Sequence, residues 1–71
     1  MAIFNATLKS GTGPSGVYSA FCEIKDDLTA PAAEAWGEGS VVVCLNTDSG
    51  GAVSVHVKLP DGSWNEVAGN G

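Results

Sequence analysis

Ser40 to Val67, SVVVCLNTDSGGAVSVHVKLPDGSWNEV, is the stretch that decides the fold, because it contains three short apolar runs separated by two turn signals. The first run, Val41 to Leu45, is mostly β-branched and almost uninterrupted, as in strands. The second run, Ala52 to Leu59, alternates, with Val53, Val55, Val57 and Leu59 on one face and Ser54, His56 and Lys58 on the other. Such alternation is typical of a half-buried strand. The stretch therefore predicts a β-meander.

The two turn signals set how these runs connect. Asn46 to Gly51 contains residues that tolerate positive φ or hydrogen-bond their own backbone, so the first two runs are expected to form a hairpin. Pro60-Asp61-Gly62 combines a preset φ, a local hydrogen-bond acceptor and a residue suited to the left-handed position of a turn. A short third strand is expected to begin at Trp64 and to include Val67.

Two further strands are predicted before the meander. Residues 2–9 alternate, with Ala2, Phe4, Ala6 and Leu8 on one side, which favours a strand or an extended arm. Residues 10–16 are rich in glycine, serine and proline and predict a flexible loop. A second strand is expected from Val17 to about Lys25, with Tyr18, Ala20, Cys22 and Ile24 on one face.

Residues 26–29 are expected to break this strand, and residues 30–36, APAAEAW, form the helical candidate. Pro31 is tolerated in a first helical turn, and Thr29 is a candidate cap. The stretch is shorter than the roughly 12 residues that an isolated helix needs. A short helical turn and an extended connector both remain open.

The predicted fold class is therefore all-β: a small antiparallel sandwich or open barrel of about five short strands. Residues 1–71 form one domain, with 1–16 as an arm and loop and 40–67 as the meander. In so short a chain, a conformational entropy of roughly 1.5 kcal/mol per residue nearly cancels the burial energy of one small core. Charged residues make up 15% of the chain, against about 25% in typical domains, which favours a partner surface as additional support.

Charge and hydropathy exclude two classes of partner. The chain has 8 acidic and 3 basic residues and a net charge of −5, so nucleic acid and anionic membranes are not expected to bind. The N-terminal residues lack the basic and apolar regions of a signal peptide, and no stretch approaches the roughly 20 apolar residues of a membrane span. We expect a soluble protein that is made in a cytoplasm.

Two segments match the residue patterns of ligand-binding motifs but lack the flanking residues or elements that those motifs need. Gly11 to Gly16 fits G-x-G-x-x-G, yet a predicted strand follows it where a dinucleotide site needs a helix. Asn46 to Gly51 resembles the start of a calcium loop, yet the twelfth position, which should be a glutamate, is Val57. Both segments are interpreted as turns, and no cofactor or metal is predicted.

The reactive side chains indicate structure rather than catalysis. Cys22 and Cys44 fall within predicted strands and are interpreted as small buried apolar residues, with a disulfide or a zinc site as alternatives. His56 shares a strand face with Ser54 and Lys58, but so small a sheet offers no deep pocket for a catalytic triad. We expect no catalytic residue and no enzymatic activity.

The large apolar side chains are the candidates for binding. One of Trp36 and Trp64 is expected to fill the core, and the other to anchor a partner, because Trp is enriched at binding hot spots. The Pro60-Asp61-Gly62 turn fixes the direction of Trp64, for which an inward position is favoured because the chain has few aromatic residues for a core. The interface candidates are Phe4, Leu8, Trp36 and Trp64.

Residues 39–47, GSVVVCLNT, and residues 55–64, VHVKLPDGSW, resemble a pattern in small virion proteins of tailed phages, particularly head decoration or cement proteins. The resemblance lies in the C-terminal part of the chain. It implies a non-enzymatic module in the virion that binds the major capsid protein or another virion protein of an assembled capsid, as a homo-oligomer such as a trimer.

Two other function classes remain open. One is a small carbohydrate- or peptide-binding β module that uses an exposed Trp. The other is a cytoplasmic domain that folds together with a partner chain. Titration against glycans and the size of the protein in solution distinguish these classes from a capsid-binding protein.

Overall fold

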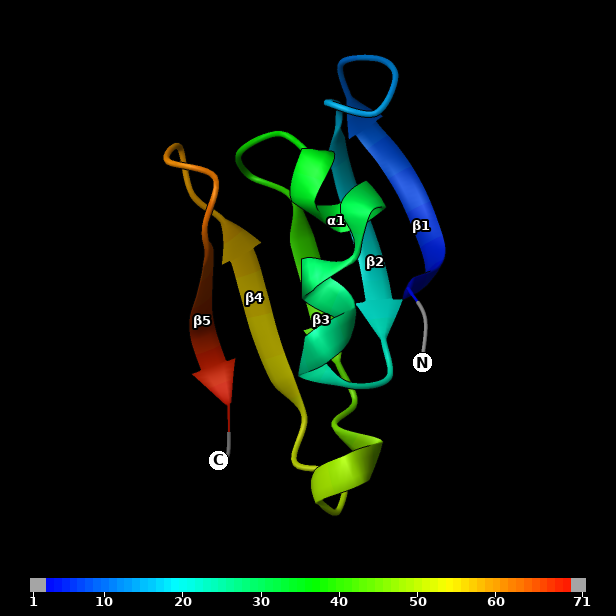
Figure 1. The fold of residues 1–71 in the computed structure, drawn as a ribbon, viewed down its shortest axis with the longest axis vertical. Helices are drawn as coiled ribbons and strands as arrows, with labels where there is room; N and C mark the ends of the chain where they lie inside the picture. The colour runs from blue at the N-terminus through cyan, green and yellow to red at the C-terminus, as the bar shows by residue number, and fades with distance from the viewer. Residues whose placement is uncertain (1–2, 70–71) are drawn as a thin grey trace.

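The computed structural model describes residues 3–69, with side chains to Val67, and its five strands form one sheet in the order β1-β2-β3-β4-β5 (Figure 1). The strands are β1 (Ile3–Ser10), β2 (Val17–Cys22), β3 (Val41–Cys44), β4 (Ser54–Lys58) and β5 (Trp64–Gly69). β2 and β3 pair in parallel, and the other neighbouring pairs are antiparallel. The prediction of a small all-β fold of about five strands is confirmed, and its strands form a single mixed sheet.

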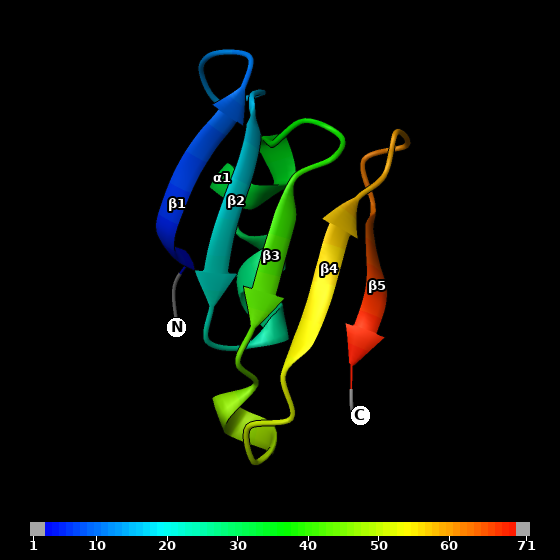
Figure 2. The ribbon, with the colours of Figure 1, turned by 180° about the vertical axis from the view of Figure 1, so that it is seen from behind.

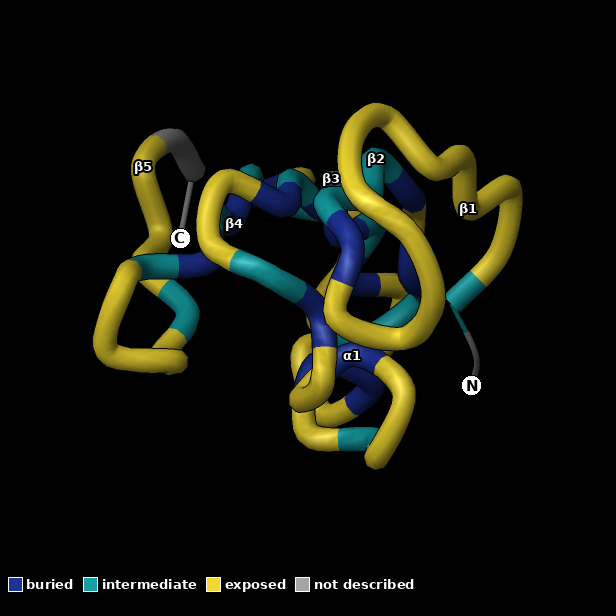
Figure 3. Tube along the Cα trace, turned by 90° about the horizontal axis from the view of Figure 1, so that it is seen from above, coloured by how far each residue is buried: buried dark blue, intermediate teal, exposed yellow. Residues whose placement is uncertain are grey.

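Two short helical segments connect the parallel strands and form the second layer of the fold. They are the 3-10 helix η1 (Lys25–Thr29) and the α-helix α1 (Pro31–Ala35). A parallel pair requires such a crossover, because its strands start at the same edge of the sheet. The crossover covers one face of the sheet (Figure 1) and leaves the other face open (Figure 2). Seen from above, α1 lies on one side of the strands (Figure 3).

Of the two alternatives left open for residues 30–36, the structure shows the short helical turn, but without the cap that the sequence suggested. α1 begins at Pro31, where the missing N–H would have had no helical partner. Thr29 does not cap it: the N-cap residue is Ala30, and the Thr29 hydroxyl donates to the Asp26 carbonyl at 2.8 Å. β2 ends at Cys22, earlier than the predicted end at about Lys25, and residues 26–29 belong to η1. The Asp27 carboxylate fixes this turn by accepting the backbone N–H groups of residues 23 and 24 at 3.1 and 3.2 Å.

β1 is a paired strand and not a free arm; its expected first residue, Ala2, lies outside the described residues. The prediction that Phe4 and Leu8 share a face is wrong. Phe4 pairs with Phe21 and Leu8 pairs with Tyr18, which lie on opposite faces of β2. The cause is a register shift between Phe4 and Thr7, where Asn5 adopts a φ of 54°. Asparagine tolerates this left-handed conformation, and the resulting bulge reverses the facing of the residues after it.

The predicted meander of residues 40–67 is confirmed as β3, β4 and β5. The β3–β4 turn contains a short 3-10 helix, η2 (Thr47–Ser49), between Asn46 and Gly50, which both have positive φ. In the β4–β5 turn Gly62 has a φ of 90°. There the Asp61 carboxylate accepts the hydroxyl and backbone N–H of Ser63 at 2.7 and 2.9 Å, and these bonds lower its pKa.

The core lies between the sheet and the crossover. Its buried cluster consists of Ala20, Cys22, Leu28, Trp36, Val42 and Cys44. Tyr18 stacks on Trp36 with ring centroids 4.7 Å apart, and Trp64 meets Trp36 edge-on at 6.5 Å. The indole N–H of Trp64 donates to the Leu28 carbonyl at 3.1 Å. Both tryptophans thus belong to the covered side of the sheet, and the inward position expected for Trp64 is confirmed.

Candidate functional site

The covered face of β4 is its polar face. Ser54, His56 and Lys58 are 2%, 4% and 2% exposed, whereas Val55 and Val57 are only half-buried on the other side. An alternating strand in a one-sided sheet normally turns its apolar residues toward the core. In β4 the polar residues face the core instead, and the valines face the other side. This arrangement creates two candidate sites: a polar network beneath the helices and a largely apolar open face.

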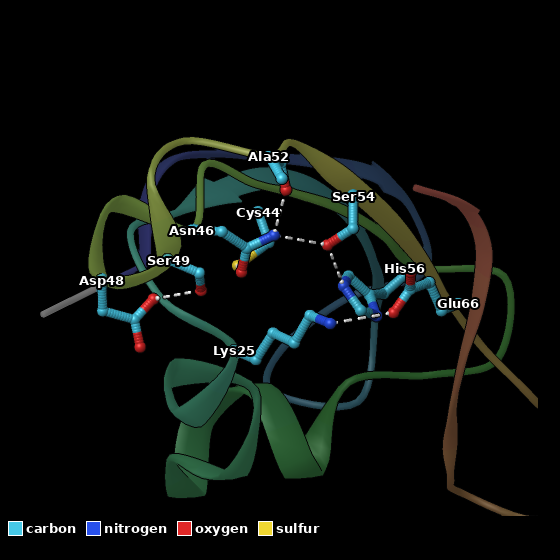
Figure 4. A network of polar contacts seen from close by, with 9 residues as sticks. All are labelled: Lys25, Cys44, Asn46, Asp48, Ser49, Ala52, Ser54, His56 and Glu66. Atoms are coloured by element: carbon cyan, nitrogen blue, oxygen red, sulfur yellow. Dashed lines mark hydrogen bonds and ion pairs between the residues drawn. The ribbon is translucent and has the colours of Figure 1, made fainter. Parts of the chain in front are cut away.

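The polar network runs along the end of the β3–β4 hairpin (Figure 4). The Cys44 thiol donates to Asn46 Oδ1 at 3.1 Å, and Asn46 Nδ2 donates to Ser54 Oγ at 2.9 Å and to the Ala52 carbonyl at 2.6 Å. Ser54 Oγ in turn lies 2.8 Å from His56 Nε2. The chain of bonds ties the turn to the sheet, since Asn46 is held by both flanking strands.

The donors around Ser54 favour one assignment of hydrogen-bond roles to Ser54 and His56. Because Ser54 Oγ accepts from Asn46, its own hydroxyl hydrogen is available for His56 Nε2, which then acts as the acceptor. Burial lowers the pKa of His56, although Glu66 opposes this shift and Lys25 adds to it. A neutral imidazole is therefore favoured. Lys25 and Glu66 themselves form an exposed ion pair at 3.1 Å, linking η1 to β5.

This serine–histidine pair lacks what nucleophilic catalysis needs. A catalytic serine must be reachable by substrate, and Ser54 is buried. Sequence reasoning placed both residues on one strand face but did not predict their hydrogen bond. The available signal was their spacing of two residues, which puts side chains on the same side of a strand.

Lys58 attaches the crossover to the sheet. Its ammonium donates to the carbonyls of Ala33 and Glu34 at 3.3 and 3.1 Å, near the end of α1, and lies 4.9 Å from the ring centroid of Trp64. Helix C-terminal carbonyls and aromatic faces both attract a cation. The buried charge is thus satisfied without a carboxylate partner among these contacts, and its role is structural.

Cys22 and Cys44 are paired across the two parallel strands, and both are free and fully buried. The interpretation of the cysteines as buried small residues is confirmed. Burial raises the pKa of Cys22 to about 12, and its hydrogen bond with Cys44 adds to the shift. Since the thiolate is the reactive form, Cys22 is poorly suited to nucleophilic or redox chemistry.

The two glycine-rich motifs form turns. Gly11 to Gly16 leads into β2, and Asn46 to Gly51 forms the β3–β4 connection. Within residues 3–69 there is no group of three or more His, Cys, Asp or Glu side chains arranged to hold a metal ion, and no pocket. In the same range no helix has the length and apolar character required to cross a membrane.

The open face is the second feature. Among the residues whose side chains are described, the strand positions that point to this side, taken from the pairing register, are Phe4, Thr7, Ser10, Val17, Ser19, Phe21, Val41, Val43, Val55, Val57 and Asn65. None of them is charged. Phe4 and Phe21 are 37% and 39% exposed and stack with ring centroids 5.8 Å apart. These eleven residues are called the open face below, and Figure 2 shows the sheet from this side.

The interface candidates from the sequence are placed in three environments. Phe4 belongs to the open face, while Leu8 is exposed on the opposite side of β1. Trp36 is 8% exposed within the core, and Trp64 is half-buried against it. The sequence analysis did not select Phe21 or the valines of β3 and β4, although the alternation of β4 identified one uniformly apolar face.

These features define the class of protein: a five-stranded mixed β-sheet with one face covered by a short helical crossover and one face open and apolar. No family model, curated protein or solved structure matches this chain.

Proposed function

We propose that this chain is a non-enzymatic structural protein that works by protein–protein contact at its open face. The observation that carries the proposal is that this face is uncharged and largely apolar in a chain with a net charge of −5. Contiguous exposed apolar surface marks interaction sites in soluble proteins. Burying such surface is worth roughly 25 cal/mol per Å².

The covered side supports a structural role as well. Asn46, Ser54 and His56 are bonded to one another, and Lys58 is bonded to α1. Every buried side-chain nitrogen and oxygen within the described residues has a hydrogen-bond partner. The polar groups that sequence analysis considered for chemistry are therefore engaged in holding the fold together.

The resemblance of residues 39–47 and 55–64 to virion proteins of tailed phages supports a specific setting for this contact. In that setting the chain is a capsid decoration or cement protein, located in the virion and bound to the major capsid protein or another virion protein. The low share of charged residues agrees with a protein whose surface is bound to other proteins when it functions. The alternative of a glycan-binding module loses support, because Trp36 is buried and Trp64 packs against it.

Co-sedimentation with virus-like particles tests the proposal. We expect the purified chain to pellet with particles assembled without it, and Val43→Lys, which places a charge at the centre of the open face, to remain in the supernatant. Ala35→Lys adds the same charge to an exposed position at the end of α1, on the covered side, and should pellet like the wild type. A wild-type chain that stays in the supernatant at saturating particle concentration would contradict the proposed setting.

A further inference from the structure

We propose that a second copy of this chain covers the open face, so that two sheets pack face to face as a symmetric dimer. The inference rests on the proposed function for one point, namely that the open face binds protein. It adds that the bound protein is a second copy of this chain. The dimer is the form of the free chain, and it must dissociate before the open face can contact a capsid.

The size of the face sets the expected strength of this contact. The molecule measures 35 × 20 × 18 Å, but the strands are only four to eight residues long, or about 13 to 26 Å, and turns make up the rest of the long axis (Figure 1). Five strands about 4.8 Å apart form a sheet about 20 Å wide, so the face measures about 400 Å². A standard interface buries about 800 Å² on each partner. A second sheet of equal dimensions covers the face without leaving a large exposed margin, and we expect a dimer that dissociates on dilution.

Charge favours self-association through this face over other faces. Two copies of a chain with net charge −5 repel each other wherever acidic groups approach. The acidic residues Asp26, Asp27 and Glu34 belong to the helical crossover, on the far side of the sheet. The paired positions of the open face carry no charge, so a face-to-face contact at these positions desolvates no charged side chain.

The distribution of side-chain size indicates the symmetry. The aromatic pair Phe4 and Phe21 stands on β1 and β2, whereas the smaller Val55 and Val57 stand on β4. β3 lies in the middle of the five strands. A two-fold axis parallel to the strands and centred over β3 therefore places β1 and β2 of each copy, which carry the phenylalanines, over β5 and β4 of the other copy, where the side chains are smaller.

The register of the sheet specifies one contact of this dimer. Phe21 and Val55 both pair with Val43, from opposite sides, so the three residues form one row across the face. The two-fold axis over β3 then places Phe21 of one copy against Val55 of the other. Three copies around a three-fold axis cannot cover their faces pairwise in this way, which favours a dimer over the trimer implied by the virion-protein resemblance.

The dimer also accounts for the reversed faces of β4. Stacked sheets lie about 10 Å apart and share a core made from the alternate residues of both inner faces. The valine face of β4 then becomes core in the dimer, while its polar face holds the crossover in place. The sandwich expected from the sequence is reached by two chains.

Sedimentation equilibrium from about 1 to about 500 μM tests the inference directly. We expect the wild type to approach twice the 7.1 kDa mass of one chain as its concentration rises, and Ala35→Lys to behave in the same way. Val43→Lys should weaken dimerisation by about 30-fold or more, as expected for a central interface residue. A wild type that is monomeric over the whole range, or a Val43→Lys variant that dimerises as tightly as the wild type, would overturn the inference.

Two measurements keep the test decisive if Val43→Lys fails to fold. The double variant Val43→Thr and Val55→Thr keeps the β-branched shape at both positions, and we expect it to be folded by circular dichroism but weakened in dimerisation. In a mixed sample of labelled and unlabelled chains, isotope-filtered NMR should show contacts between the Phe21 ring and the Val55 methyl groups of different chains. Unchanged dimerisation of the double variant, or a dimer without this contact, would contradict the proposed arrangement.

The outcomes for the dimer and for the capsid setting can be told apart. A monomeric wild type that pellets with virus-like particles rejects the dimer and leaves the proposed function in place. A face-to-face dimer that does not pellet with particles supports the dimer and rejects the capsid setting.

Discussion

Ser54 Oγ lies 2.8 Å from His56 Nε2, and both side chains are buried beneath the helical crossover. In isolation this distance resembles the serine–histidine contact of a hydrolase. Its surroundings give it another role, because Asn46 donates to the same serine oxygen and belongs to the turn that joins β3 to β4. The contact is one link in a chain of bonds that fixes the hairpin against the covered side of the sheet.

The first prediction concerns acid stability and His56. Burial lowers the pKa of this histidine below its ordinary value of 6.5, so the unfolded chain takes up the proton at a higher pH than the folded chain does. The unfolded state then binds more protons as the pH falls below about 6.5, and folding stability decreases in that direction. We expect the melting temperature to be level above about pH 7 and to fall as the pH decreases below about 6.5.

His56→Gln provides the control for this titration, because His56 is the only histidine in the chain. The variant should lose the part of the slope that begins just below about pH 6.5, whatever its absolute stability. A wild type with a flat profile just below this pH, or a variant with an unchanged slope, would show that another group is responsible.

The second prediction concerns the polar network. Ser54→Ala leaves Asn46 Nδ2 with one partner fewer and His56 Nε2 without its hydroxyl donor. Removing one partner from a buried polar group typically costs about 1 to 3 kcal/mol. Chemical denaturation should show a loss in this range for Ser54→Ala. Ser49→Ala, which removes a hydroxyl bonded only to the exposed Asp48 at 3.2 Å, should change stability by less than about 0.5 kcal/mol.

Much of the fold was predictable from local chemistry. Pro60-Asp61-Gly62 and Asn46 to Gly51 supply turn geometry through their own backbone preferences, so the meander follows from short segments of sequence. The faces of β2 also follow, since Tyr18, Ala20 and Cys22 alternate without interruption. In these elements the deciding interactions lie within a few residues of one another.

The remaining features depend on interactions that are distant in sequence. The bulge at Asn5 puts Phe4 and Leu8 on opposite faces of β1. A single asparagine in an alternating run is not enough to predict such a bulge. Alternation along β4 defines two faces but not which of them is covered. That choice depends on Lys58 reaching α1 and on Ser54 reaching Asn46, contacts that exist only after the crossover and the hairpin have formed.

The third prediction concerns the two cysteines. Because Cys22 and Cys44 are free and fully buried, a thiol reagent at about pH 8 should modify neither of them in the native protein. Denaturation should release both thiols for modification, and reductant should leave the melting temperature unchanged. A native mass two daltons below that of the reduced chain, with a loss of stability on reduction, would indicate a disulfide instead.

The fourth prediction concerns calcium and the β3–β4 turn. The Asp48 carboxylate accepts the Ser49 hydroxyl, and Gly50 and Gly51 occupy positive φ as turn residues. The position that would supply a closing glutamate is Val57, which lies on the open face. Millimolar calcium should therefore not alter the melting temperature. A rise of several degrees with calcium, but not with magnesium, would disprove this interpretation.

The last prediction concerns Trp64, which is both packed and hydrogen-bonded. Its ring meets Trp36 edge-on, its N–H donates to the Leu28 carbonyl, and the Lys58 ammonium lies over its face. Trp64→Ala removes all three contacts and should cost about 3 kcal/mol, enough to unfold a large fraction of so small a domain at physiological temperature. Trp64→Phe keeps a ring at this position but removes the N–H, so it should cost about 1 kcal/mol.

Measuring the two Trp64 variants beside Val67→Ala separates core packing from partner binding. Val67 is 55% exposed on the same strand, and its truncation should leave the melting temperature within a few degrees of the wild type. If Trp64 acts through the core, loss of particle binding in Trp64→Ala will follow loss of folding, and Trp64→Phe will retain both. A Trp64→Ala variant that melts like the wild type but no longer binds particles would instead show that this side chain contacts the partner, because the monomer would not need it.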